Sequence, residues 1–97
     1  MTKADKVLSR WLNNPPKDER IDKVKAFLDR HFGENWRWEG GSHIIAADER
    51  LIDHDLTGPA GDFSVPVKGG QKVKGRYLKR LAILANYLKE IERKEEQ

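Results

Sequence analysis

The stretch Trp36-Arg37-Trp38-Glu39-Gly40-Gly41-Ser42-His43-Ile44-Ile45-Ala46-Ala47 decides the fold. Residues 36–39 alternate apolar and polar side chains, which is typical of a strand. Gly40-Gly41 supplies the turn into a second strand, which is expected from His43 to about Ala47. The same alternation returns in Phe63-Ser64-Val65-Pro66-Val67 and predicts a third strand. Because proline cannot donate to a ladder, this strand should lie at an edge of the sheet or end near Pro66.

Helical patterns flank these strands on both sides. The first amphipathic helix is expected from about Lys3 to Leu12, with Thr2 as its N-cap. A second helix is expected over about 18–31, with Gly33 as the residue that ends it. A third is expected over about 74–93. The predicted order of elements is therefore α-α-β-β-β-α.

This order predicts an α+β fold in which helices pack on one face of a three-stranded antiparallel sheet. Residues 1–97 are expected to form one domain, with an additional N-terminal helix in 1–14 and a core in 18–93. If His43 points to the open face of the sheet, strand periodicity sends Ile44 and Ala46 to the core and leaves Ile45 outside. The inward set is then expected to include Trp36, Trp38, Phe63, Val65 and Val67.

Charge is unevenly distributed along the chain. The net charge is +3 and the sequence pI is about 9.3, which favours acidic partners. Residues 68–80 contain six cations and no carboxylate, whereas residues 48–62 contain five carboxylates and one arginine. With no cysteine, no long apolar run and no signal-like start, we expect a cytoplasmic protein that does not engage a membrane.

His43 is the first candidate for chemistry. A histidine titrates near neutral pH and can give or take a proton there. The flexible Gly41 and the hydroxyl and N–H of Ser42 would allow a phosphate oxygen to bind beside it. The alternative is an ordinary polar residue in a Gly-Gly hairpin turn. His31 and His54 are weaker candidates, since one lies near a helix end and the other in the acidic segment.

The segment Lys68-Gly69-Gly70-Gln71-Lys72-Val73-Lys74-Gly75-Arg76 is the second candidate. Glycines let the backbone approach a ligand closely, and a helix N-terminus with nearby cations attracts phosphate. The expected phosphate-binding side chains are Lys68, Lys72, Lys74 and Arg76. The alternative is a solubilising surface loop followed by an ordinary helix start.

Two other kinds of site are considered. Tryptophans 11, 36 and 38 could stack on bases, but their spacing favours the core. His54 with Asp53, Asp55 and His43 could ligate a cation, although no spacing here matches a known ligand pattern. We therefore expect no metal and no other cofactor.

The ordered set Gly41-Ser42-His43, Phe63-Ser64-Val65-Pro66-Val67 and Lys72-Val73-Lys74-Gly75-Arg76-Tyr77-Leu78 resembles the HicA toxins of bacterial HicA–HicB toxin–antitoxin pairs. The resemblance covers about residues 21–88. It implies a double-stranded-RNA-binding-like fold and endoribonuclease cleavage of messenger RNA, with His43 at the position of the family histidine. It also implies a HicB antitoxin as partner. The acidic turn after His43 and the extra N-terminal helix depart from the family pattern.

The predicted function is therefore a metal-independent endoribonuclease that acts as a toxin. RNA carries its own nucleophile, the 2′-hydroxyl, so His43 is expected to perform one of two proton transfers. The Ser42 N–H and the four cations would stabilise the charge that develops on the phosphate. Two alternatives stay open: a non-catalytic RNA-binding module, and a protein-interaction domain that binds an acidic partner.

Overall fold

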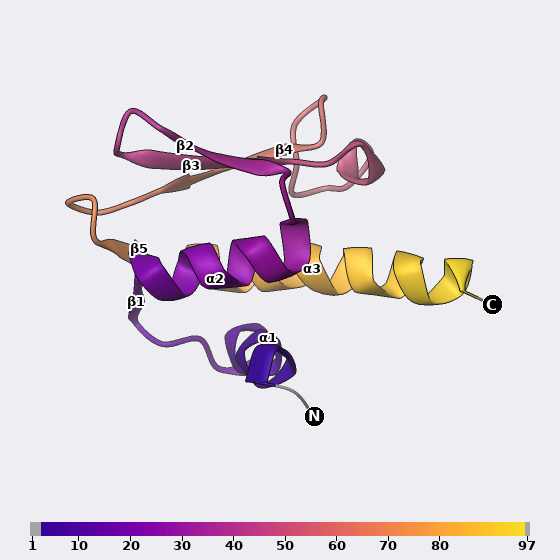
Figure 1. Ribbon diagram of the computed structural model, residues 1–97, viewed down its shortest axis with the longest axis horizontal. Helices are drawn as coiled ribbons and strands as arrows, with labels where there is room; N and C mark the ends of the chain where they lie inside the picture. Colours follow the sequence, from indigo (N-terminus) through magenta and orange to yellow (C-terminus); the bar gives the residue numbers. More distant parts are fainter. Residues whose placement is uncertain (1–2, 97) are drawn as a thin grey trace.

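A three-stranded antiparallel sheet forms one layer of the molecule (Figure 1). The computed structural model describes residues 3–96. The strands are β2 (Trp36–Glu39), β3 (His43–Ala47) and β4 (Asp62–Pro66), in the order β2-β3-β4. The strand predicted around Phe63–Val67 is confirmed, and it lies at an edge with Pro66 as its last residue.

Helices cover only one face of this sheet. Figure 1 shows α2 (Ile21–Phe32) and α3 (Gly75–Glu95) beneath the strands, and α1 (Lys3–Asn13) on the far side of that helical layer. The three predicted helices are therefore present, and the domain is of the α+β class. The N-cap expected at Thr2 lies outside the described residues.

The strand register separates a core face from an open face. Across the sheet, Ile44 pairs with Trp38 and Val65, and Ala46 pairs with Trp36 and Phe63. Ile44 and Ala46 are buried and His43 is exposed, which is the arrangement that followed from assuming His43 on the open face. Residues directly opposite each other in the sheet share a face. The open face therefore carries the remaining cross-strand pairs, including those of His43.

The two tryptophans of β2 face the core, as expected, but they are not fully buried. Trp36 and Trp38 are only half-buried against the core, because β2 is an edge strand with a neighbouring strand on one side only. The Trp36 indole N–H donates to Asp29 Oδ1 at 2.9 Å, and the Lys25 ammonium lies 5.0 Å from the centre of the Trp38 ring. The hydrogen bond gives the Trp36 N–H a partner, and the ammonium makes a cation–π contact with Trp38.

A second, two-stranded ribbon was not predicted. It pairs β1 (Asp18–Arg20) with β5 (Lys72–Lys74) in antiparallel orientation. The second helix therefore begins at Ile21 rather than near residue 18. Three-residue polar strands carry too little periodicity to be recognised in sequence, and this pair forms only because the fold brings its two strands together.

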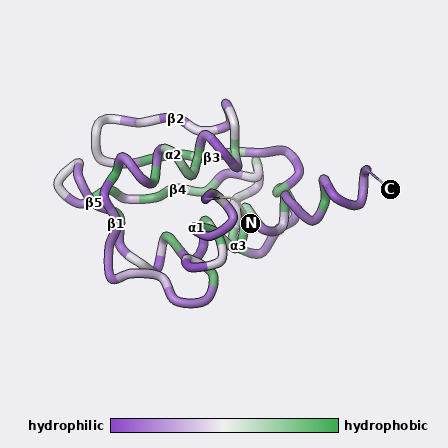
Figure 2. Tube along the Cα trace, turned by 60° about the horizontal axis from the view of Figure 1, so that its bottom comes forward, coloured by the Kyte–Doolittle hydropathy of each residue, from purple (hydrophilic) through white to green (hydrophobic). Residues whose placement is uncertain are grey.

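The N-terminal helix is part of the core. Leu8 and Trp11 of α1 are buried, and the Trp11 ring lies 4.4 Å from that of Phe27 on α2. One cluster of buried side chains joins α1, α2, the sheet and α3. Beyond it the last turns of α3 become hydrophilic and extend past the other elements (Figure 2). Within residues 3–96 no helix has the length and apolar character needed to cross a membrane.

The acidic connection after β3 is more ordered than its composition indicates. It contains a short 3-10 helix, η1 (Glu49–Leu51), whose Leu51 is buried. Asp48 is also buried, and its carboxylate accepts from the Arg50 Nη2 at 2.8 Å and from the Asn35 side chain at 3.2 Å. One of the five carboxylates in this segment therefore serves to hold the loop together.

Candidate functional site

His43 stands at the start of β3 on the open face of the sheet. The turn at residues 40–42 places it there, and Gly40 and Gly41 adopt φ values of 61° and 70°, a region that favours glycine. The Ser42 Oγ lies 2.9 Å from His43 Nδ1. The side chain is exposed, so its Nε2 edge is accessible to a ligand.

A small basic pocket lies at the edge of β4. Its volume is about 210 Å³, and it opens between the end of β4 and the start of α3. The residues that line it are Pro66, Val67, Lys68, Lys74, Arg76 and Tyr77. Three cations and no carboxylate line this pocket, which suits it to an anion.

The fold brings the turn and the basic segment together. His43 is the cross-strand partner of Pro66, which lines the pocket. The Val67 N–H donates to the Ser42 carbonyl at 2.8 Å. A Cβ added to Gly70 would lie 3.5 Å from the Gly41 carbonyl oxygen, so the two Gly-Gly turns are neighbours. The turn that carries His43 therefore lies next to one wall of the pocket.

Lys72 does not join the other three cations. Its side chain lines a separate hollow with Arg20, Ile21, Asp22 and Gln71. The physical reason is β5 itself, since Lys72 pairs with Arg20 across the short ribbon and is drawn toward the start of α2. The expectation that four cations share one pocket is therefore met by Lys68, Lys74 and Arg76 alone.

Tyr77 is a pocket residue that the sequence interpretation did not include among the site residues. The Arg76 guanidinium lies 5.0 Å from the centre of its ring, and that of Arg80 lies 5.9 Å away. Arg76 also approaches the Tyr77 hydroxyl at 3.4 Å. The available signal was an aromatic residue between cations in Arg76-Tyr77-Leu78-Lys79-Arg80, a pattern suited to stacking on bases.

The start of α3 forms part of this pocket wall. Lys74 is the N-cap, it makes no side-chain capping bond, and the first turn contains no acid. The Gly75 N–H already donates to the Lys17 carbonyl at 2.8 Å. The remaining N–H groups of a first helical turn favour a nearby anion.

The two other histidines have structural surroundings. The His54 Nδ1 accepts the Leu56 N–H at 3.1 Å, and its ring meets Tyr87 edge-on at 4.9 Å. His31 packs 4.4 Å from Phe27, and its buried Nε2 has no hydrogen-bond partner within the described chain. Burial lowers the pKa of His31, and the nearby Arg30 and Lys89 lower it further. Within residues 3–96 no three His, Asp or Glu side chains are grouped so as to hold a metal ion.

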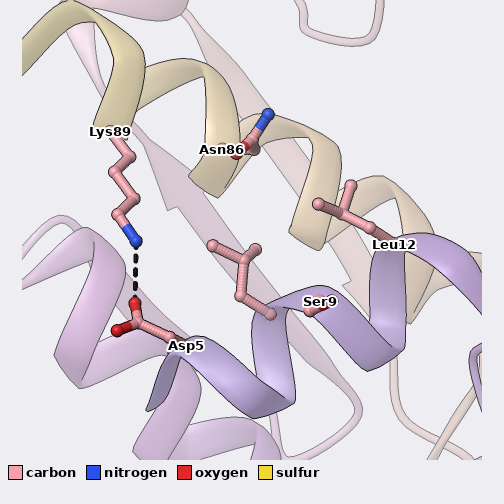
Figure 3. A pocket seen from close by; sticks show the side chains of 6 residues that line it. Asp5, Ser9, Leu12, Asn86 and Lys89 are labelled. Carbon is pink, nitrogen blue, oxygen red and sulfur yellow. Dashed lines mark hydrogen bonds and ion pairs between the residues drawn. The ribbon is translucent and has the colours of Figure 1, made fainter. Parts of the chain in front are cut away.

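A larger hollow lies between α1 and α3, away from the sheet. It has a volume of about 470 Å³, and Figure 3 shows the Lys89 ammonium spanning it to Asp5, with an N–O distance of 2.7 Å. Ser9, Leu12 and Asn86 line the same hollow (Figure 3). The ion pair neutralises its charge, so it lacks the cationic character of the pocket beside His43.

Comparison of the chain with models of known protein families, with curated proteins and with solved structures found no match. The resemblance to HicA toxins therefore stays a prediction based on the order of three sequence motifs. The geometry described above is independent of it.

Proposed function

We propose that this protein is a metal-independent endoribonuclease that cleaves messenger RNA and acts as the toxin of a toxin–antitoxin pair of the HicA–HicB type. One observation carries the proposal: His43 lies on the open sheet face directly across from Pro66, which lines the pocket with Lys68, Lys74 and Arg76. A proton-transfer group beside a cationic pocket is what phosphodiester cleavage requires.

The chemistry follows from this adjacency. The cations bind a phosphate of the RNA backbone, and the Ser42 N–H and the first turn of α3 stabilise the charge that develops on it. His43 transfers a proton while its Nδ1 is oriented by the Ser42 hydroxyl. Tyr77 stacks on a neighbouring base. The fold is proposed to be of the double-stranded-RNA-binding-like class, since helices pack on one face of a three-stranded antiparallel sheet.

The proposed partner is a HicB-type antitoxin that covers this surface. The pocket is acid-free and the chain has a net charge of +3, so an acidic partner would neutralise it.

The test is RNA cleavage by wild type and His43→Ala in the presence of EDTA. Wild type is expected to cut, and His43→Ala to lose about 10²–10⁴-fold in rate. Thermal unfolding of the variant should match wild type, because the side chain is exposed. If wild type binds RNA in a salt-sensitive manner and leaves it intact, the protein is a non-catalytic RNA-binding module. If it neither binds nor cuts RNA, the protein is an interaction domain for an acidic partner.

A further inference from the structure

A carboxylate faces His43 across the hairpin. Glu39 is the last residue of β2 and the direct cross-strand partner of His43, and both side chains are exposed. Directly opposite residues of an antiparallel pair lie on the same face, with Cβ atoms about 4.5–5.5 Å apart. The turn at residues 40–42 fixes this pairing, because Ser42 N–H closes back onto the Glu39 carbonyl at 3.4 Å.

The three strands place these groups in a row. Glu39 on β2, His43 on β3 and Pro66 on β4 occupy consecutive positions across the open face. His43 therefore lies between Glu39 on one side and Pro66, a residue of the cationic pocket wall, on the other.

Arg37 completes the arrangement on β2. It lies two residues before Glu39, on the same face, and its Nη2 is 3.3 Å from Glu39 Oε2. The guanidinium orients the carboxylate and adds a cation to the open face. Arg37 on β2 is therefore in ion-pair contact with Glu39, while the pocket cations lie beyond Pro66 on β4.

From this register we propose that Glu39 is the second proton-transfer residue of the site, acting as general base while His43 acts as general acid. The inference rests on the proposed ribonuclease function. The Glu39 carboxylate takes the proton of the 2′-hydroxyl as the 2′-oxygen bonds to phosphorus. The bond from phosphorus to the 5′-oxygen breaks, and the leaving oxygen takes a proton from the His43 imidazolium. The products are a 2′,3′-cyclic phosphate and a 5′-hydroxyl, and exchange with water restores both side chains.

A substrate with sulfur in place of the leaving 5′-oxygen tests this division of roles. A thiolate departs without protonation, so loss of the acid is bypassed whereas loss of the base is not. Glu39→Gln is expected to slow cleavage of both ordinary and sulfur-substituted RNA by about 10²–10⁴-fold. His43→Ala is expected to cleave ordinary RNA slowly and to cleave the sulfur-substituted RNA at close to the wild-type rate.

Glu49→Gln is the matched control, because Glu49 is exposed on η1 at the other end of β3. It should cut both substrates at the wild-type rate. Thermal unfolding of Glu39→Gln should show a folded domain, since the side chain faces solvent.

Each other outcome is informative. If Glu39→Gln cuts ordinary RNA at the wild-type rate, Glu39 takes no part in the reaction and the inference is wrong while the nuclease stands. If Glu39→Gln cleaves the sulfur-substituted RNA at the wild-type rate, the assignment of base and acid is overturned. If wild type itself does not cut, the ribonuclease proposal fails first.

Discussion

The Val67 amide donates a hydrogen bond of 2.8 Å to the carbonyl oxygen of Ser42. Ser42 precedes the exposed imidazole of His43, and Val67 lies in the wall of the cationic pocket. A backbone bond depends on neither side chain, so it couples the two halves of the site whatever residues occupy them. The position of His43 relative to the pocket wall is consequently set by backbone pairing between β3 and β4.

The pocket cations should control the salt dependence of RNA affinity. We expect Lys68→Ala, Lys74→Ala and Arg76→Ala each to weaken binding to single-stranded RNA and to make the slope of log affinity against log salt shallower by about 0.7 per lost phosphate contact. Lys72→Ala should have a smaller effect, because its side chain lines a different hollow. Lys6→Ala, at an exposed position of α1, is the control. Equal effects at all five positions would argue for diffuse attraction without a pocket.

Tyr77 should contribute to RNA binding through its aromatic ring. Base stacking on an aromatic side chain contributes about 1–3 kcal/mol, so Tyr77→Ala is expected to weaken RNA binding by roughly 5- to 150-fold. Tyr77→Phe keeps the ring and should bind within a few-fold of wild type. Fluorescence anisotropy with a short labelled RNA measures both. A loss in Tyr77→Phe as large as in Tyr77→Ala would show that the hydroxyl, not the ring, makes the contact.

Gly75 should tolerate no side chain. A Cβ there would overlap the Pro16 carbonyl oxygen, which lies against the start of α3. Gly75→Ala is therefore expected to cost about 1–3 kcal/mol, despite the better helix propensity of alanine. Chemical denaturation gives the free energy of unfolding. Lys79→Ala, exposed in the same helix, should change it by less than about 0.5 kcal/mol, and an equally mild Gly75→Ala would contradict the prediction.

The ionised Asp48 carboxylate should stabilise the fold at neutral pH and lose this effect in acid. Hydrogen bonds from the Arg50 side chain lower the pKa of this carboxyl below its ordinary 3.8. When the pKa of a carboxyl is lower in the folded than in the unfolded chain, the carboxylate stabilises the fold at pH values above the unfolded-state pKa. This stabilisation is lost as the pH falls through the folded-state pKa. Asp48→Asn is expected to cost about 1–3 kcal/mol at pH 7, since the part-buried Arg50 and Asn35 donors lose an ionised acceptor. Asp53→Asn, exposed in the same loop, should be neutral, and unfolding curves that coincide for the two variants would refute this role.

His31 should make the domain less stable in mild acid. Its pKa in the folded state is lowered by burial, and by Arg30 and Lys89, while Asp5 and Glu92 act in the opposite direction. The unfolded chain therefore takes up a proton near pH 6.5 that the folded chain resists, and the free energy of unfolding decreases as pH falls below that value. His31→Phe should flatten the decrease between pH 7.5 and 5.5. A variant that follows the wild-type curve would assign the decrease to other groups.

Much of the fold could be predicted from the sequence. Alternation in β2, β3 and β4 and the apolar stripes of the helices are local periodicities, and they identified the three long strands and three helices. Periodicity did not decide which face of β3 is buried, because Ile44 and Ile45 are both apolar, and the structure buries Ile44 and exposes His43. Alternation did not predict how deeply Trp36 and Trp38 are buried, because burial at an edge depends on the neighbouring layer.

The sequence by itself determined the candidate groups: an imidazole after Gly-Gly-Ser, and an acid-free run of cations before a helix. Only the tertiary structure decided which of them meet. Pairing across the sheet sets Glu39 and Pro66 on either side of His43, and the short β1–β5 ribbon turns Lys72 away from the pocket. Residue types, their spacing and the β2–β3 hairpin are local properties of a chain, whereas the β3–β4 and β1–β5 pairings arise from hydrogen bonds between strands that are distant in sequence.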